Sequence, residues 1–186
     1  METTVPPAAC GLVSRFNHWL IVAGMIGMLG FGLYIENAGL EGAARGAALG
    51  VHKAIGVLVL AFCAWRVDFR LYRGFPAPVA ALPAWQEAGA KAVHWLLLVG
   101  IVLMPVSGLV MSAFGGRATD VFGVFAIPAG PKIEWLNEGA GEVHSLVGYL
   151  LVAVVAAHAG AALKHHVLDR DATLLRTIAG RTVSRD

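Results

Sequence analysis

The segment that decides the fold is VHSLVGYLLVAVVAAHAGAAL, residues 143–163. Its 21 residues carry no Asp, Glu, Lys or Arg, and at about 1.5 Å per residue such a helix crosses roughly 30 Å of hydrocarbon. Two histidines, His144 and His158, lie within it. Because ionisable side chains are rare inside membrane spans, they indicate a functional site there. We therefore expect a membrane-spanning helix that carries two functional histidines.

The spacing of these two histidines predicts how they are arranged. His144 and His158 are 14 residues apart, which corresponds to roughly 21 Å along a helix axis and places them within roughly 40° of one face. One helix therefore offers two ligands at two depths of the membrane.

Three further segments have the same apolar character. Residues 16–35 and 92–116 carry no charge, and residues 46–65 are interrupted by Lys53 and flanked by Arg45 and Arg66. A lysine near a helix end can extend its ammonium to the interface. We predict an all-α integral membrane four-helix bundle forming a single domain over residues 1–186, with spans at about 14–35, 46–66, 92–114 and 142–164. A hairpin or re-entrant second segment is the alternative.

Composition excludes several classes of protein. The chain has 186 residues, of which 58% are hydrophobic and 14% charged, and a mean hydropathy of +0.70, whereas soluble domains are roughly a quarter charged. A net charge of +2 without a Lys/Arg stripe argues against a nucleic acid partner. Neither cysteine belongs to a C-x-x-C-H sequence, which excludes covalent c-type haem attachment. The first 14 residues contain no Lys or Arg, so we expect no cleaved signal peptide.

The distribution of basic residues predicts the orientation. With four spans, ten of the 14 Lys and Arg residues fall on the side of both termini and the middle linker, and four fall on the other side. This asymmetry is typical of a protein whose N- and C-termini are cytoplasmic. Acidic residues outnumber basic ones by six to four on the outer side, so the summed charge does not favour an anionic substrate there.

Two more histidines match the depths of the first two. His18 opens the first span on the cytoplasmic side, at the level of His158, and His52 opens the second span on the outer side, at the level of His144. Imidazole is a common axial ligand of haem iron, and helix bundles hold cofactors between facing helices. The pattern predicts two stacked, non-covalent haem b groups with bis-histidine ligation. Isolated helix-end histidines are the alternative, while a zinc site would require ligands that converge on one ion.

Other polar residues are expected to support these sites. We predict that His94, at the start of the third span, packs near the inner haem without ligating it. Arg15 and Lys53 are candidates to pair with the haem propionates, or else serve as interfacial anchors. Each ligand should donate its second ring nitrogen to a carbonyl or hydroxyl; Asn17 and Ser145 are adjacent in sequence to ligands.

The third span contains a further expected feature. Pro105 should kink the helix and leave a carbonyl for Ser107 or a neighbour to satisfy.

Six short motifs occur in an order that spans nearly the whole chain. They are SRFNHW (14–19), VHKAIG (51–56), VHW (93–95), LMPVSGLVM (103–111), EVHSLVGY (142–149) and HAGAALKHHVLDRDATLLR (158–176). In this order they resemble the bacterial cytochrome b561 family of small four-helix dihaem proteins of the inner membrane.

That resemblance implies a function and a ligand set. It implies that His18, His52, His144 and His158 hold two haems, and that electrons pass between the quinone pool and a second redox partner. The member type that the C-terminal motif resembles oxidises superoxide to dioxygen and reduces ubiquinone. The KHH sequence, Lys164, His165 and His166, implies a quinone near His165; a basic helix end facing anionic lipid is the alternative.

Three function classes follow from these expectations. The first is a superoxide:ubiquinone oxidoreductase that acts alone in the bacterial inner membrane. The second is a haem b electron-transfer subunit of a hydrogenase- or dehydrogenase-type complex, which requires a redox partner protein. The third is a non-redox membrane protein whose histidines bind metal or protons.

Overall fold

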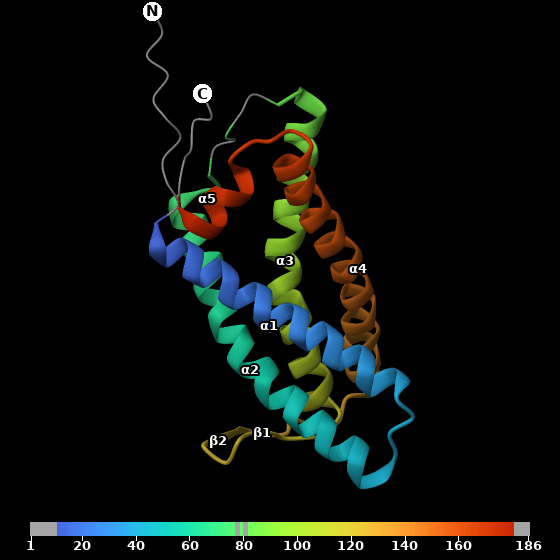
Figure 1. The fold of residues 1–186 in the computed structure, drawn as a ribbon. Coiled ribbons are helices and arrows are strands. Elements are labelled where there is room, and N and C mark those ends of the chain that lie inside the picture. Colours follow the sequence, from blue (N-terminus) through green and yellow to red (C-terminus); the bar gives the residue numbers. More distant parts are fainter. Residues whose placement is uncertain (1–10, 77–78, 80–81, 181–186) are drawn as a thin grey trace, which may run out of the picture.

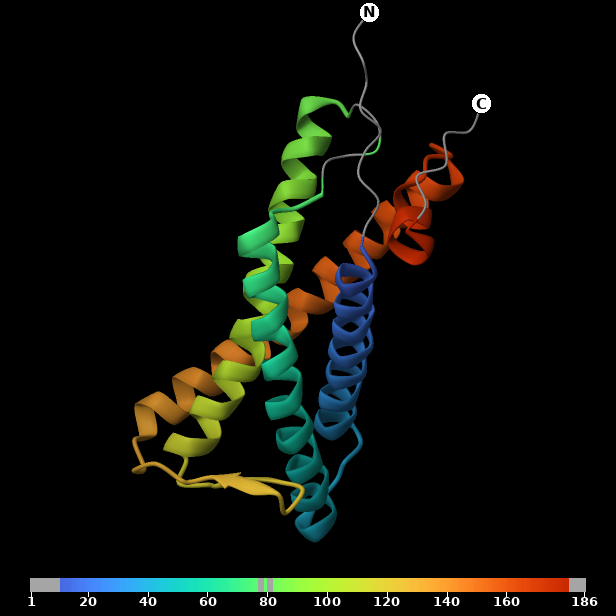
Figure 2. The same ribbon diagram turned by 90° about the vertical axis from the view of Figure 1, so that its left-hand side faces the viewer.

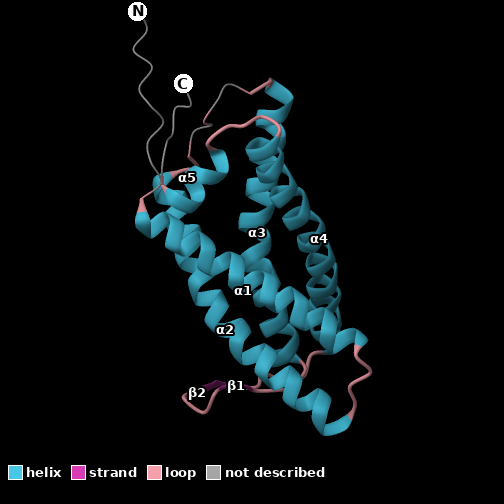
Figure 3. Cartoon of the chain, in the orientation of Figure 1, coloured by secondary structure: helices cyan, strands magenta, loops and turns pink. Residues whose placement is uncertain are grey.

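Four long helices form the body of the molecule. The computed structural model describes residues 11–76, 79 and 82–180, and Figures 1 and 3 show the helical arrangement. Each of the four helices is long and apolar enough to cross a membrane. They are α1 (Leu12–Asn37), α2 (Gly42–Arg73), α3 (Ala84–Phe114) and α4 (Glu134–Val167). The predicted four-helix membrane architecture is confirmed.

The helices are longer than the predicted spans, most of all α2 and α4. The α2 helix has 32 residues, so the alternative of a hairpin or re-entrant second segment is wrong. It passes through Arg66 and ends at Gly74, where φ is 70°. Glycine adopts that left-handed conformation without the strain that a side chain imposes. The linker between the second and third spans is correspondingly shorter than charge positions alone suggested.

A β-hairpin and a short helix were not predicted. β1 (Thr119–Val121) and β2 (Phe125–Ile127) form an antiparallel hairpin between α3 and α4. Positive φ angles at Phe122 (54°) and Gly123 (73°) fit a tight turn that matches the twist of paired strands. A short helix, α5 (Thr173–Ala179), follows α4. The hairpin is the one departure from an all-α chain among the described residues.

The bundle has two distinct ends. One end, called the α5 end below, carries the short helix α5. Figures 1 and 2 show that the start of α1, the end of α2, the start of α3 and the end of α4 lie at this end. The opposite end, called the hairpin end, carries the α1–α2 connection and the β-hairpin, which extends across the N-terminal part of α2 in Figure 2.

An apolar core occupies the middle of the bundle. Leu151, 2% exposed, is central to it and lies seven residues from both His144 and His158. A Cβ atom on Gly100 would lie 2.6 Å from Leu151 Cδ2, so only glycine lets α3 approach α4 this closely. The buried cluster comprises Ile21, Met25, Leu29, Cys63, Leu98, Ile101, Val147 and Leu151.

Candidate functional site: two tiers of histidines

The structure brings the histidines together in the pairs that the sequence predicted. The ring centroids of His52 and His144 lie 6.3 Å apart at 83°, and those of His18 and His158 lie 6.5 Å apart at 71°. Near-equal spacing and edge-on orientation recur at both ends of the core. We call these groups the hairpin-end tier and the α5-end tier.

In the hairpin-end tier, the backbone of α3 fixes the ring of His144. Its Nδ1 lies 2.9 Å from the carbonyl oxygen of Met104 and 3.2 Å from Ser107 Oγ. Ser107 in turn donates to the same carbonyl at 2.8 Å. Because a carbonyl only accepts, Nδ1 carries the proton and Nε2 keeps its lone pair. The carbonyl or hydroxyl partner that a ligating histidine is expected to have is therefore present. It is the Met104 carbonyl, with the Ser107 hydroxyl beside it, rather than Ser145.

Glycines let these two rings pack directly against the neighbouring helices. A Cβ atom on Gly108 would lie 3.0 Å from Cε1 of His144, and one on Gly32 would lie 3.4 Å from Cε1 of His52. Both histidines line a cavity of about 610 Å³ between the four helices. The Nδ1 atom of His52 is buried without a hydrogen-bond partner among the described residues. A cavity with two imidazoles and room beside each fits a large flat ligand.

The α5-end tier contains a third histidine. The ring of His94 lies 5.6 Å from that of His158 and stacks on Phe75 at 5.3 Å and 14°. His94 thus lies at the level where it was expected to pack, and its ring is nearer to that of His158 than the ring of His18 is, at 5.6 Å against 6.5 Å.

An arginine contacts the other ring of this tier. Arg66 Nη2 lies 3.3 Å from Nδ1 of His18, and its Nη1 donates to Asn17 Oδ1 at 3.3 Å. Because a guanidinium only donates, Nδ1 of His18 accepts here. Asn17, which was considered as the partner of the His18 ring, instead contacts Arg66.

A second arginine lies one turn further along α2. Arg70 is buried and donates to Ser14 Oγ at 2.9 Å. The sequence reasoning missed both arginines as site residues, although their spacing of four placed them on one face of the second helix near its C-terminal end.

The two cations that were candidates for propionate partners or interfacial anchors contact protein groups. Arg15 Nη1 donates to the carbonyl of Ile178 in α5 at 3.0 Å. Lys53 Nζ donates to the carbonyl of Ala118 at 2.8 Å and to Ser112 Oγ at 3.2 Å, at the base of the hairpin. Lys53 also lines the cavity, whereas Arg15 faces the C-terminal segment.

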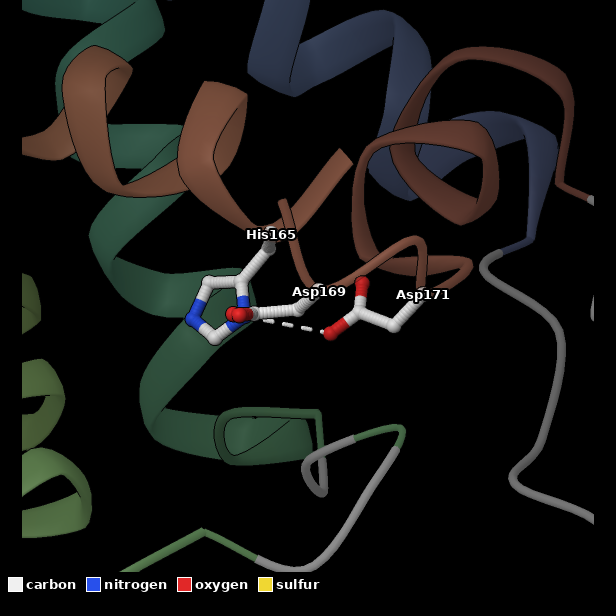
Figure 4. A group of neighbouring side chains, drawn as sticks. All are labelled: His165, Asp169 and Asp171. Carbon is white, nitrogen blue, oxygen red and sulfur yellow. Dashed lines mark ion pairs between the residues drawn. The ribbon is translucent and has the colours of Figure 1, made fainter. Parts of the chain in front are cut away.

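His165 forms a polar cluster at the α5 end. Its Nδ1 lies 2.9 Å from Asp169 Oδ2 and 3.1 Å from Asp171 Oδ2, as Figure 4 shows. Lys164 Nζ lies 2.7 Å from Asp169 Oδ2. His166 Nδ1 is buried without a hydrogen-bond partner in the described part of the chain. Of the KHH residues, His165 and Lys164 thus share one ionic cluster.

Comparison with known proteins agrees with this geometry. The family model of prokaryotic cytochrome b561 matches residues 9–180. Cytochrome b561 homolog 2 of Escherichia coli (strain K12) is 29% identical over 96% of this chain and 95% of its own length. Cytochrome b561 homolog 1 of the same strain is 31% identical over 70% of this chain and 74% of its own length.

A third relative has a more specific name. The probable superoxide oxidase CybB of Yersinia pestis is 27% identical over 68% of this chain and 72% of its own length. With a family model that covers nearly all of the sequence and four apolar helices, the chain belongs to the prokaryotic cytochrome b561 family, multi-pass electron-transfer proteins of the bacterial inner membrane that bind haem b.

Proposed function

We propose that this chain, as a single domain, transfers electrons across the membrane through two bis-histidine haem b groups. The observation that carries the proposal is the repeated histidine pair, with centroids 6.3 and 6.5 Å apart, on either side of the Leu151 core. A bound haem supplies one-electron redox chemistry at each tier. The protein supplies the ligands, their orientation and an apolar surrounding.

At the hairpin end, the proposed ligands are His52 and His144. The Met104 carbonyl holds Nδ1–H of His144, which leaves Nε2 to bind iron and fixes the plane of the ring. Gly108 and Gly32 let the two rings pack against the neighbouring helices, and the cavity that both histidines line has room for a macrocycle. These residues fit the cofactor that the family implies.

At the α5 end, the proposed ligands are His18 and His158. Ligation by Nε2 of a neutral His18 ring requires the proton on Nδ1, where Arg66 now donates. Arg66 therefore has to withdraw from that nitrogen when haem binds. Arg66 and Arg70 are better placed than Arg15 to meet an anionic propionate, because they lie beside His18 and Ser14.

We assign the α5 end to the cytoplasm and the hairpin end to the outer side of the membrane. The assignment rests on the ten-to-four distribution of Lys and Arg. The four helices and the position of α5 place the start of α1 and the end of α4 at the same end.

The specific reaction that we propose is superoxide:ubiquinone oxidoreduction. Two superoxide ions give two electrons and leave as dioxygen, and ubiquinone takes two electrons and two protons to become ubiquinol. The printed name of the Yersinia relative supports this substrate. The cavity at the hairpin end also gathers Arg45, Lys53 and Arg117 against Glu36. This local excess of positive charge favours an anion, although the outer side as a whole is acidic.

The experiment uses the full chain, purified and reconstituted in vesicles. Haem is counted per chain by the pyridine method, and superoxide is then supplied outside with ubiquinone-1 in the membrane. We expect two haem b per chain and quinol formation that superoxide dismutase suppresses. Two haems without quinol formation would favour an electron-transfer subunit that needs a partner protein, and the absence of haem would contradict the proposal.

A further inference from the structure

The tip of the β-hairpin exposes large apolar side chains. Residues 121–127 read VFGVFAI and carry no charge. Phe122 is 56% exposed, Val124 82% and Phe125 50%, so no described element of the chain covers them. Apolar side chains gathered in this way mark an interaction surface, because burial would remove their area from water. The covering surface therefore comes from the surroundings of the chain.

The root of the same hairpin is fixed to the bundle. Thr119 and Val121 are each 2% exposed, and β1 packs against α2. Lys53 Nζ donates to the carbonyl oxygen of Ala118 at 2.8 Å, directly before β1. The apolar tip is therefore held in one place and is not part of a loose loop.

The turn at the tip places a phenylalanine where glycine or asparagine would be less strained. Phe122 has a φ of 54° and Gly123 a φ of 73°, both positive as in the turns that close β-hairpins. The Asp120 carboxylate accepts the backbone N–H of Gly123 at 3.0 Å and supports the turn. Bulky residues rarely adopt a positive φ, and strained positions of this kind occur where a side chain is used. The turn therefore indicates a role for the Phe122 ring.

The level of the hairpin follows from its contact with α2. The ammonium group of Lys53, which the hairpin root contacts, is too polar to stay in hydrocarbon and extends to the interface. The 32 residues of α2 extend roughly 48 Å, which exceeds a hydrocarbon thickness of about 30 Å. Figure 1 shows the hairpin projecting to the side of the bundle, across the helices, with the start of α2 extending further out. The tip is thus directed along the membrane surface.

Lipid fits this surface better than a soluble partner does. Interfacial elements insert apolar side chains about 5–10 Å into the boundary between headgroups and acyl chains. Headgroups and water can pair there with the free edge of the two-stranded sheet, which hydrocarbon could not do. A soluble redox partner is steered by charge, and residues 121–127 offer none. A surface that projects sideways at this level therefore meets lipid.

We infer that the hairpin is an interfacial anchor, in which Phe122, Val124 and Phe125 insert into the lipid leaflet at the hairpin end. The partner is the bilayer surface, and no particular headgroup is needed because the three side chains carry no charge. Lys53 both contacts the hairpin root and lines the cavity, so insertion of the tip also holds this lysine at a fixed depth. The inference holds for any electron-transfer reaction of the chain, since it involves no haem ligand.

The first test measures the depth of the tip in the full chain, reconstituted in vesicles of phosphatidylethanolamine and phosphatidylglycerol. A nitroxide is attached to Val124→Cys in a Cys10→Ser background, where Cys63 is buried and should take no label. Power-saturation EPR compares collisions of the nitroxide with oxygen, which concentrates in lipid, and with a water-soluble nickel complex. We expect the ratio of oxygen to nickel accessibility to be several times that of a label in water.

Two matched sites bracket this result. Glu41→Cys lies at the start of α2, where the side chain is exposed, and its label should report water. Leu58→Cys, 44% exposed in the middle of α2, should report hydrocarbon. We expect the ratio for Val124→Cys to lie between the two. A ratio equal to that of Glu41→Cys would overturn the inference. Dipolar broadening that disappears on dilution with unlabelled chain would also overturn it, because a second copy would then cover the tip.

A second variant tests which side chains hold the tip in lipid. Phe122→Asn/Phe125→Ser is added to the labelled Val124→Cys chain; asparagine suits the positive φ of the turn, so the hairpin should still form. We expect the accessibility ratio to fall severalfold, toward that of Glu41→Cys. The matched control is Trp135→Ser, which removes an exposed ring from the start of α4 and should leave the ratio unchanged. An unchanged ratio in the double variant would overturn the inference.

Haem content separates the anchor from the proposed function. Each labelled chain should keep the same number of haems as the unlabelled parent chain, which shows that the bundle is intact. The depth of the label is read without any electron transfer. A parent chain that forms no quinol would therefore contradict the proposed reaction, whereas a tip as accessible to nickel as Glu41→Cys would contradict the anchor alone.

Discussion

The two tiers differ in whether their histidine rings are already arranged to ligate a haem. At the hairpin end, His144 is held by Met104 and Ser107, both rings pack against glycines, and a cavity lies beside them. At the α5 end, three histidines share one level, and Arg66 occupies the nitrogen of His18 that should carry a proton for ligation. One tier is organised for a ligand, whereas the other has to rearrange.

This difference has an energetic reason. The carbonyl of Met104 in α3 lies within an apolar bundle, where it accepts hydrogen bonds from the His144 ring and from Ser107. The α5 end lies near the surface and gathers guanidinium groups, which need anionic partners when they are buried. We therefore expect the hairpin-end tier to respond sharply to single substitutions and the α5-end tier to depend on which histidine is removed.

The largest expected effect is the loss of one haem. His52→Ala and His144→Ala should each remove the hairpin-end haem, because bis-histidine ligation fails without either ring. The pyridine assay should fall from two haems to one per chain, and both variants should lose the same spectral component. Loss of different components would break the pairing.

The second prediction decides between the histidines that flank His158. His18→Ala should lose the α5-end haem, whereas His94→Ala should keep two haems and change only the spectrum or potential of that haem. The measurement is haem content together with a redox titration. One haem per chain in His94→Ala and two in His18→Ala would show that His94, and not His18, is the haem ligand.

The third prediction tests the close packing of His144 against Gly108. Gly108→Ala places a Cβ atom 3.0 Å from the ring, so the ring must move and haem occupancy at the hairpin end should fall severalfold. The matched control is Gly27→Ala in α1, where a Cβ atom meets nothing within 4 Å; it should be neutral or stabilise the helix by up to about 1 kcal/mol. Equal haem occupancy in the two variants would contradict a role for the close contact between Gly108 and the His144 ring.

The smallest expected effect comes from Ser107→Ala. It removes a hydroxyl 3.2 Å from Nδ1 of His144 but leaves the Met104 carbonyl in place. The loss of about 1 kcal/mol of hydrogen bonding corresponds to a shift of about 40 mV in the potential of one haem. A potentiometric titration should find that the potential of the hairpin-end haem is shifted and that of the other haem is unchanged. A shift in the potential of the other haem would contradict this assignment.

The number of membrane-spanning helices and the pairing of histidines were predictable from the sequence. Apolar length fixes a span, and the periodicity of a helix fixes which residues share a level, as with His144 and His158. Helix ends were less predictable, because Arg66 and Arg70 continue α2 beyond the charge that was taken as its limit. A charge ends an apolar run, but it does not end a helix.

Partners between helices were out of reach of the sequence. Lys53 was a candidate either for a propionate partner or for an interfacial anchor, and it donates to Ala118 and Ser112 at the base of the hairpin. Arg15 donates to Ile178, 163 residues away. Such contacts depend on how the helices pack and on which connection lies nearby.

The sequence by itself determined that this chain spans the membrane four times and carries histidines at two depths, because hydrophobicity and helical periodicity are local properties. The tertiary structure alone decided that Met104 orients His144, that Arg66 meets His18, and that two aspartates converge on His165. These contacts join different helices or pass through a turn with positive φ, and no spacing along the chain encodes the direction of a side chain across such a gap.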